Sequence, residues 1–134
     1  MAVKILAVIV PYHPCRQILQ RQLDALLPQV TGVVIVDNAS SDDKRSWLRD
    51  LSLSNDTIHL KELVENLGIA KAQNEGIIWA KDQDANFVLL MDQNSQPASN
   101  MVSLLFSAYE NLVALCEQVS ALGPKFVDVD SGKV

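Results

Sequence analysis

The feature that most constrains the fold is a set of short, almost purely apolar runs separated by amphipathic stretches. Residues 4–10 read KILAVIV, residues 33–37 VVIVD and residues 86–91 NFVLLM. Runs of this length are typical of strands buried on both faces, as in parallel sheets covered by helices. Between the first two runs, residues 16–27 carry leucine and isoleucine at helical spacing. The pattern predicts an α/β protein with a mostly parallel sheet.

The alternation of strands and helices continues along the chain. We expect three further helices and one weaker strand, at residues 42–51, 69–81, 101–115 and 57–60. Residues 119–122 are interpreted as another strand, and residues 125–134 as the start of a hairpin that turns at 130–132. Residues 1–134 contain no linker and are expected to form one domain. Because the chain stops where the second hairpin strand would run, it is interpreted as part of a longer protein.

Bulk composition narrows the class of protein. The 134 residues are 49% apolar and 20% charged, which is typical of one soluble globular domain. The net charge of -5 provides no basic stripe, so we expect no nucleic-acid partner. No run approaches the roughly 20 apolar residues that span a bilayer. Cys15 and Cys116 stand alone, which favours free thiols and a cytoplasmic location.

Polar residues follow the predicted strands at the sheet edge where α/β proteins bind their ligands. They are Tyr12 and His13 after the first strand, Asp37 and Asn38 after the second, Asp92, Gln93 and Asn94 after the fourth, and Asn66, Gly68, Lys71 and Asn74 in the loop and helix between. Carboxylate, amide and phosphate oxygens are ligands that Mg²⁺ and Mn²⁺ prefer. The arrangement predicts a nucleotide site with a divalent cation.

Simpler structural explanations exist for several of these residues. Asp37 could cap the turn that follows it, and Asn66 with Gly68 could form a turn that needs glycine at positive φ. Asp92 could be the ordinary polar end of a buried strand. Nicotinamide binding and P-loop chemistry are not favoured, because the sequence lacks GxGxxG after its first strand and lacks a GKS or GKT motif.

Five blocks in order resemble the N-terminal half of an inverting family 2 glycosyltransferase with the GT-A (Rossmann-like) fold. The blocks are AVIVPYHP, VVIVDNASSD, NLGIAKAQNEGI, VLLMDQNSQP and ALGPKFVD. They are most similar to the bacterial rhamnosyltransferase branch. The resemblance covers almost the whole chain and implies a GT-A sheet truncated before the acceptor half.

The resemblance implies a role for each candidate residue. Asp37 would bond the nucleobase edge, and Pro11, Tyr12 and His13 would line the base and ribose pocket. Asn66, Gly68 and Asn74 would form the wall beside the nucleotide, with Lys71 nearby. Asp92 and the residue at 94 would touch the ribose and hold Mg²⁺ or Mn²⁺ on the diphosphate. Asn94 stands where the family usually has aspartate, so weaker metal affinity is expected, because an amide lacks the charge that offsets dehydration of the ion.

The implied reaction is transfer of a sugar, expected to come from dTDP-rhamnose, to a surface-polysaccharide or lipid-linked saccharide with inversion. The catalytic base would lie beyond Val134, and the full-length parent would associate peripherally with the inner face of the membrane. Apolar surface left by the missing half would favour a homo-oligomer. The alternatives are a catalytically silent nucleotide-binding fragment or pseudoenzyme, and an unrelated α/β domain that acts through protein contacts.

Overall fold

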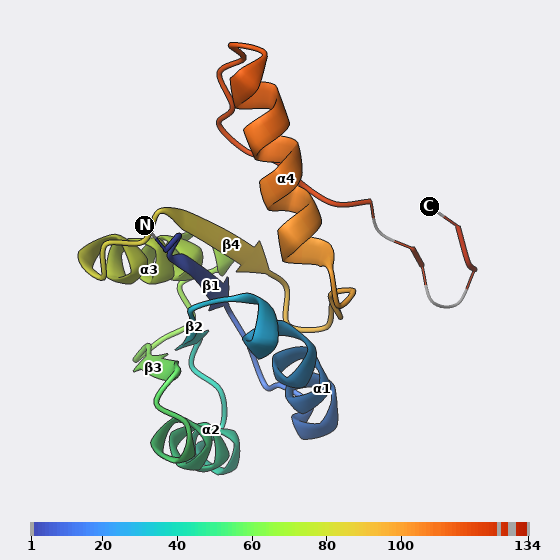
Figure 1. Cartoon of the computed structure of the whole chain (residues 1–134). Helices are drawn as coiled ribbons and strands as arrows, with labels where there is room; N and C mark the ends of the chain where they lie inside the picture. Colours follow the sequence, from blue (N-terminus) through green and yellow to red (C-terminus); the bar gives the residue numbers. More distant parts are fainter. Residues whose placement is uncertain (1, 126, 129–130, 134) are drawn as a thin grey trace. The chain divides into compact units, whose positions relative to one another are not determined.

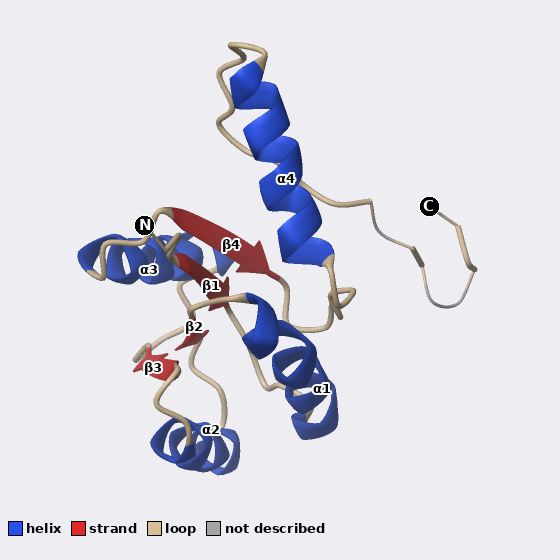
Figure 2. Ribbon diagram, in the orientation of Figure 1, coloured by secondary structure: helices blue, strands red, loops and turns tan. Residues whose placement is uncertain are grey.

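The computed structural model describes residues 2–125, 127–128 and 131–133, which form two compact units, residues 1–97 and residues 98–134 (Figure 1). The first unit alternates strands and helices as predicted (Figure 2). Its elements are β1 (Ile5–Ile9), α1 (Arg16–Leu26), the short 3-10 helix η1 (Leu27–Gln29), β2 (Gly32–Asp37), α2 (Asp42–Ser54), β3 (Ile58–Glu62), α3 (Ile69–Asp82) and β4 (Phe87–Met91).

The four strands form one parallel sheet in the order β3-β2-β1-β4. The chain proceeds outward from β1 to β3 and then returns to the other side of β1 with β4. The switch point of the sheet therefore lies between β1 and β4. Because crossovers between parallel strands are right-handed, this reversal places α3 on the opposite face from α1 and α2.

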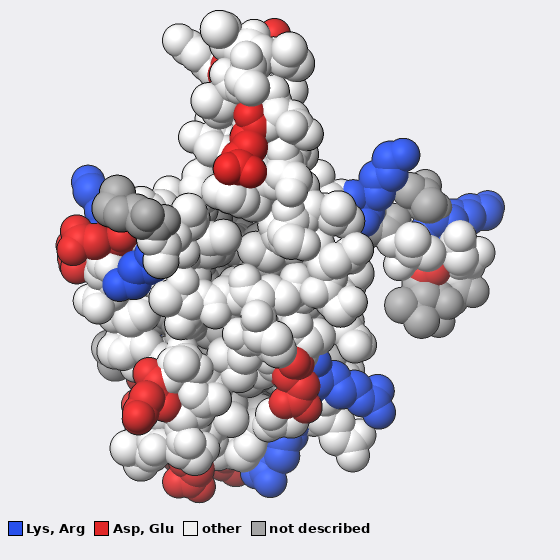
Figure 3. Space-filling view, viewed as in Figure 1, with Lys and Arg blue, Asp and Glu red and all other residues white. Residues whose placement is uncertain are grey.

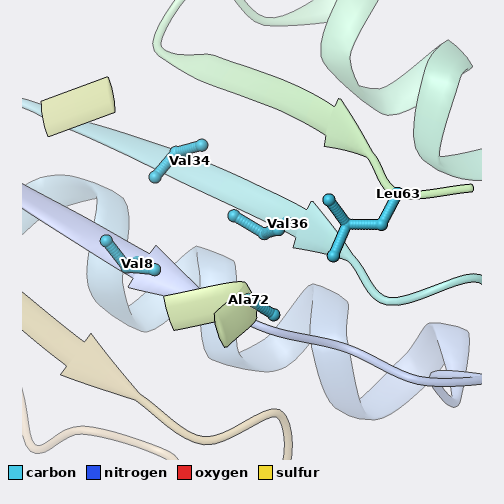
Figure 4. Close-up of a cluster of buried hydrophobic side chains, with 5 residues drawn as sticks. All are labelled: Val8, Val34, Val36, Leu63 and Ala72. Atoms are coloured by element: carbon cyan, nitrogen blue, oxygen red, sulfur yellow. The ribbon is translucent and has the colours of Figure 1, made fainter. Parts of the chain in front are cut away.

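A cluster of small apolar side chains joins the sheet to α3. Val8, Val34 and Val36 lie on one face of neighbouring strands and pack with Leu63 and Ala72 (Figure 4). On the opposite face of these strands Ala7, Ile9, Val33 and Ile35 are also fully buried, as expected for strands covered on both faces. Short valine and alanine side chains let the helix approach the sheet closely.

Replacing Gly76 on α3 with alanine is expected to destabilise the fold. A Cβ there would overlap Cγ1 of Val8 and lie 3.2 Å from Cγ2 of Val36. Alanine normally stabilises a helix interior by about 1 kcal/mol over glycine. Here we expect a loss of about 1–3 kcal/mol in the free energy of unfolding, because valine is stiff and cannot move aside.

Urea unfolding of Gly76→Ala measures this loss. The same substitution in a Val8→Ala background should cost less, because the overlapping methyl groups are then absent. An alanine variant as stable as the parent would show that the helix can shift at no cost.

The second unit is built on one helix, α4 (Met101–Ala114), which confirms the predicted helix to within one residue. The strand predicted at residues 119–122 is wrong, because this segment is irregular and exposed. Its apolar pattern is insufficient, since a strand is stable only when another strand pairs with it.

The predicted hairpin lies partly outside the described residues. In its described part, the Asp128 N–H donates to the Lys133 carbonyl at 2.9 Å, and the Gly132 N–H donates to the Asp128 carbonyl at 2.8 Å. Gly132 has φ +65°, which glycine adopts without strain. These bonds join residues 128, 132 and 133, and the described residues of this segment contain no strand.

The distribution of charged side chains, the helices and the cysteines agree with what the composition predicts. On the face drawn in Figure 3, the described lysine and arginine side chains are scattered among acidic ones instead of forming a stripe. None of the helices in the described part of the chain is both long enough and apolar enough to cross a membrane. Cys15 and Cys116 are both exposed and unpaired, which confirms the prediction of free thiols.

Candidate functional site

Asn38, directly after β2, joins three loops at the carboxyl edge of the sheet. Its backbone N–H donates to the Pro11 carbonyl at 3.0 Å. Its side-chain Nδ2 donates to Oδ1 of Asn66 at 3.0 Å, and its Oδ1 accepts the Leu67 N–H at 2.9 Å. Asn38 is only 3% exposed, and all its bonds point to the loops after β1 and β3. The loop ends that carry the predicted base contacts are therefore held together.

Gly68 begins α3 in a conformation that requires glycine. Its φ is +81°, and its N–H donates to Oδ1 of Asn66 at 2.9 Å. An added Cβ would meet nothing within 4 Å, so backbone conformation and not space explains the residue. The structural explanation from the sequence is confirmed: Asn66 and Gly68 form a turn, which lies at the carboxyl edge of the sheet.

The loop after β1 is fastened to the loop after β2 through His13. The His13 N–H donates to Ser40 Oγ at 2.9 Å, and its Nδ1 accepts the Ser41 N–H at 3.1 Å. His13 has φ 48°, an uncommon value for a side-chain-bearing residue that these two bonds compensate. The ring of Tyr12 lies 4.1 Å from the His13 ring and is 47% exposed, so an aromatic face is presented at this edge.

Asp37 at the end of β2 is completely buried and uses only one of its carboxylate oxygens. Oδ2 accepts the Ser40 N–H at 3.2 Å and pairs with Nε of Arg45 at 3.0 Å. Arg45 also donates to the Leu63 carbonyl. Oδ1 is buried with no hydrogen-bond partner in the described part of the chain, which is costly for a carboxylate. One oxygen thus caps the turn, while the other is an acceptor without a donor.

Asp92 lies in a turn after β4 that reaches the β1 loop across the switch point. Its Oδ2 accepts the Ser95 Oγ–H at 2.9 Å. The next residue, Gln93, accepts the Tyr12 N–H through Oε1 at 2.7 Å. Asp92 and Asn94 are both exposed. The structure therefore brings the Asp92 turn next to Tyr12, as the parallel sheet predicted.

Two predicted site residues lie apart from this network. Lys71 and Asn74 are exposed on α3, and neither is joined by a hydrogen bond to the other site residues that the structure describes. Cys15 is exposed close to His13 in sequence, and the backbone amides of Ile18 and Gln17 lower the pKa of its thiol. The lowered pKa follows from the position of Cys15 at the N-terminus of α1.

Sequence reasoning missed three residues that hold the site: Gln22, Ser40 and Arg45. Gln22 could have been recognised from the sequence, because it is the one polar residue on the apolar face of the helix, at helical spacing from the buried leucines Leu19, Leu23 and Leu26. Arg45 has none, since an arginine in the first turns of a helix is ordinarily solvated. Its partner Asp37 becomes evident only when α2 is placed beside β2.

The side-chain oxygen atoms after β4 can supply part of the coordination shell of a hard divalent cation. No group of three His, Cys, Asp or Glu side chains that could hold a metal occurs among the described residues. Asp92 and Asn94 offer one carboxylate and one amide oxygen. Mg²⁺ and Mn²⁺ accept such donors when phosphate oxygens and water complete the shell. The donor set therefore suits a cation that arrives with a diphosphate.

The fold and these strand-end contacts define a doubly wound α/β protein with its polar residues gathered along the carboxyl edge of the sheet. The chain belongs to glycosyltransferase family 2: the family described as "Glycosyl transferase family 2" matches residues 7–126. It is 33% identical over 126 residues to the dTDP-rhamnosyl transferase RfbF of Shigella flexneri, covering 94% of this chain and 40% of that protein. The chain thus spans about two fifths of the length of this relative.

Solved glycosyltransferases share the fold. The mannosyltransferase PcManGT from Pyrobaculum calidifontis, in complex with GDP-Man and Mn²⁺, matches with a TM-score of 0.62 at 22% identity, over 77% of this chain and 31% of that chain. TarS 1–349 of S. aureus matches with a TM-score of 0.62 at 17% identity, over 92% of this chain and 39% of that chain. These likenesses confirm the predicted GT-A fold, and the chain spans 31% and 39% of the length of these two solved chains.

Proposed function

We propose that this chain is the nucleotide-sugar-binding part of an inverting glycosyltransferase whose donor is dTDP-rhamnose. The observation that carries the proposal is the buried Oδ1 of Asp37, an acceptor without a donor at the carboxyl end of β2. A thymine or uracil ring has an N–H group that can donate a hydrogen bond to a carboxylate oxygen. The choice of donor sugar rests on the likeness to a dTDP-rhamnosyl transferase.

The base enters between the loops after β1 and β3 in this proposal. Pro11, Tyr12 and His13 form one side, and the exposed Tyr12 ring supplies a face for stacking. Asn66 and Gly68 form the other side, and Lys71 and Asn74 on α3 extend that wall. Because Oδ1 of Asp37 is closed off from solvent in this conformation, the base reaches it only after a small shift of the surrounding loops.

The diphosphate lies toward β4, where Asp92 and Asn94 hold Mg²⁺ or Mn²⁺. When bound, the cation offsets the charge that develops on the nucleoside-diphosphate leaving group. Ser95 Oγ–H holds Oδ2 of Asp92, and in this proposal the carboxylate touches the ribose and binds the cation. Solved relatives that contain Mn²⁺ support a divalent cation here.

The remaining chemistry is proposed to lie beyond Val134. The catalytic base and the site for a surface-polysaccharide or lipid-linked acceptor belong to that part, and the full-length protein would work in the cytoplasm, peripherally at the inner face of the membrane. The 134-residue chain would bind nucleotide without transferring sugar. Val88 and Leu90 on β4 are 36% and 45% exposed, which supports self-association of the chain, measurable by light scattering.

Titration calorimetry with dTDP tests the proposal directly. We expect binding without metal that tightens when Mn²⁺ is added, because the base contacts and the cation contacts come from different strands. UDP, which keeps the N–H of the pyrimidine ring, serves as the related nucleotide. If no nucleoside diphosphate binds with or without Mn²⁺, the proposed function is wrong.

Asn94→Asp is expected to strengthen the Mn²⁺-dependent part of dTDP binding by about tenfold, since a carboxylate offsets dehydration of the ion better than an amide does. Affinity measured without metal should stay the same. Asn100→Asp, an exposed substitution of the same kind outside the turn, is the matched control. Equal Mn²⁺-dependent affinities for Asn94→Asp and the parent would remove position 94 from the metal site.

A further inference from the structure

Gln22 is a buried polar residue on a helix face that is otherwise apolar. It is 1% exposed on α1, beside Leu19, Leu23 and Leu26, which are completely buried. Burying an amide costs free energy unless its hydrogen bonds are made inside the protein. The helix alone gives no reason for a glutamine at this position, so the reason must lie in what its side chain contacts.

Both N–H groups of the Gln22 side-chain amide donate hydrogen bonds to one turn that is distant in sequence. Nε2 donates to the Asp92 carbonyl and, at 2.6 Å, to the Ser95 carbonyl, which lie 70 and 73 residues along the chain. An NH₂ group has two hydrogens, so these two bonds use its full donor capacity. The opposite amide orientation would set an oxygen against two carbonyl oxygens, which fixes the assignment.

The same amide leaves its other end unsatisfied. Oε1 of Gln22 is buried with no hydrogen-bond partner in the described chain. An unsatisfied buried acceptor is destabilising, so the side chain satisfies the turn at the expense of its own oxygen. The turn is fastened on its outer side as well, by the Ser95 Oγ–H bond to Oδ2 of Asp92. Gln22 thus holds the backbone carbonyl of Asp92, and Ser95 holds its carboxylate.

We propose that Gln22 is a positioning residue: by clamping the carbonyls of Asp92 and Ser95 it holds the turn that presents Asp92 and Asn94 to the cation. The part concerning the cation rests on the proposed function, whereas the clamp itself rests on the contacts alone. Gln22 touches neither nucleotide nor metal. It acts on them through the backbone to which the two ligands are attached.

Gln22→Met tests the clamp, because methionine has similar length and no polar hydrogen and suits the apolar face. Gln20→Met is the matched control: it changes the same residue type on the same helix, where the half-buried Gln20 amide donates to Oδ1 of Asp24 and not to the turn after β4. In nucleotide-free protein, ¹⁵N relaxation should show order parameters of residues 93–96 falling from about 0.85 toward 0.6 or less in Gln22→Met alone. A turn as ordered as in the parent would overturn the proposal.

Calorimetry on the same two variants tests the consequence for the cation. The Mn²⁺-dependent part of dTDP affinity should fall about tenfold in Gln22→Met, in the range typical of residues that orient metal ligands. Metal-free affinity should not change, and Gln20→Met should match the parent in both. A mobile turn with unchanged Mn²⁺ dependence would overturn the positioning role. If the parent itself binds no dTDP, the proposed function fails, and the relaxation data still decide whether Gln22 holds the turn.

A second variant covers the case in which Gln22→Met does not fold. Gln22→Glu keeps the side-chain length and supplies one O–H donor only while the carboxyl is protonated. Burial favours the neutral acid, so its pKa should be raised. The turn should be ordered below that pKa and mobile above it. Order parameters that do not respond to pH would contradict the clamp.

Discussion

Arg45→Met is expected to lower the free energy of unfolding by about 3 kcal/mol, the lower end of the range for breaking a buried ion pair. Asp37 is fully buried, and Arg45 is the only described cation paired with it, at 3.0 Å. Removing the guanidinium leaves a buried carboxylate without compensation and frees the Leu63 carbonyl that Arg45 also binds. The lower end applies because the Arg45 side chain keeps 19% exposure.

Urea unfolding of Arg45→Met and Arg49→Met makes the comparison on one helix. Arg49 pairs with Glu62 on the surface, where its side chain is 56% exposed, so its loss should cost less than about 1 kcal/mol. Asp37→Asn combined with Arg45→Met should recover part of the stability, because no charge is then left buried. Equal costs for the two arginines would mean that the Asp37 pair contributes no more than a surface pair.

Asp37→Asn is expected to weaken dTDP binding by about 10- to 100-fold even without metal, which corresponds to losing a hydrogen bond to a charged group. Asparagine keeps the size of the side chain but places an NH₂ group where one carboxylate oxygen was. If that group takes the position of the unpaired Oδ1, two donors face each other. Asp37→Ala should weaken binding as well, and calorimetry without Mn²⁺ measures both.

Arg45→Met separates this effect from a general loss of stability. It breaks the same ion pair but leaves both Asp37 oxygens as acceptors, so at a temperature where it remains folded it should bind dTDP more tightly than Asp37→Asn does. An unchanged dissociation constant in Asp37→Asn would remove Asp37 from the base contacts. Thermal unfolding of each variant shows that the measured protein is folded.

The sheet could be predicted because a strand that is buried on both faces is apolar at almost every position, and this pattern is visible in the local sequence. Residues 5–9 and 32–37 are apolar at almost every position, and each forms a strand of the parallel sheet. Parallel strands end at one edge, so the polar residues after them had to lie near one another. Contacts such as Tyr12 with Gln93 and Asn38 with Asn66 follow from that geometry.

What the sequence could not predict depends on partners that are distant along the chain. The strand expected at residues 119–122 is apolar enough, but the sequence does not say whether a second strand will pair with it. Gln22 and Arg45 each have an ordinary local role, as a helical glutamine and a helical arginine. Only the packing of α1 and α2 shows that Gln22 binds the turn after β4 and that Arg45 binds the carboxylate at the end of β2.

The position of β4 at the end of the sheet has a consequence for how such a chain comes to fold. Every strand pairing described here lies within the first 91 residues, so the sheet can assemble on the ribosome before later residues emerge. During that interval β4 presents a row of unpaired backbone groups with Val88 and Leu90 exposed. The nascent protein is then most open to wrong partners at the strand that leads into the Asp92 turn.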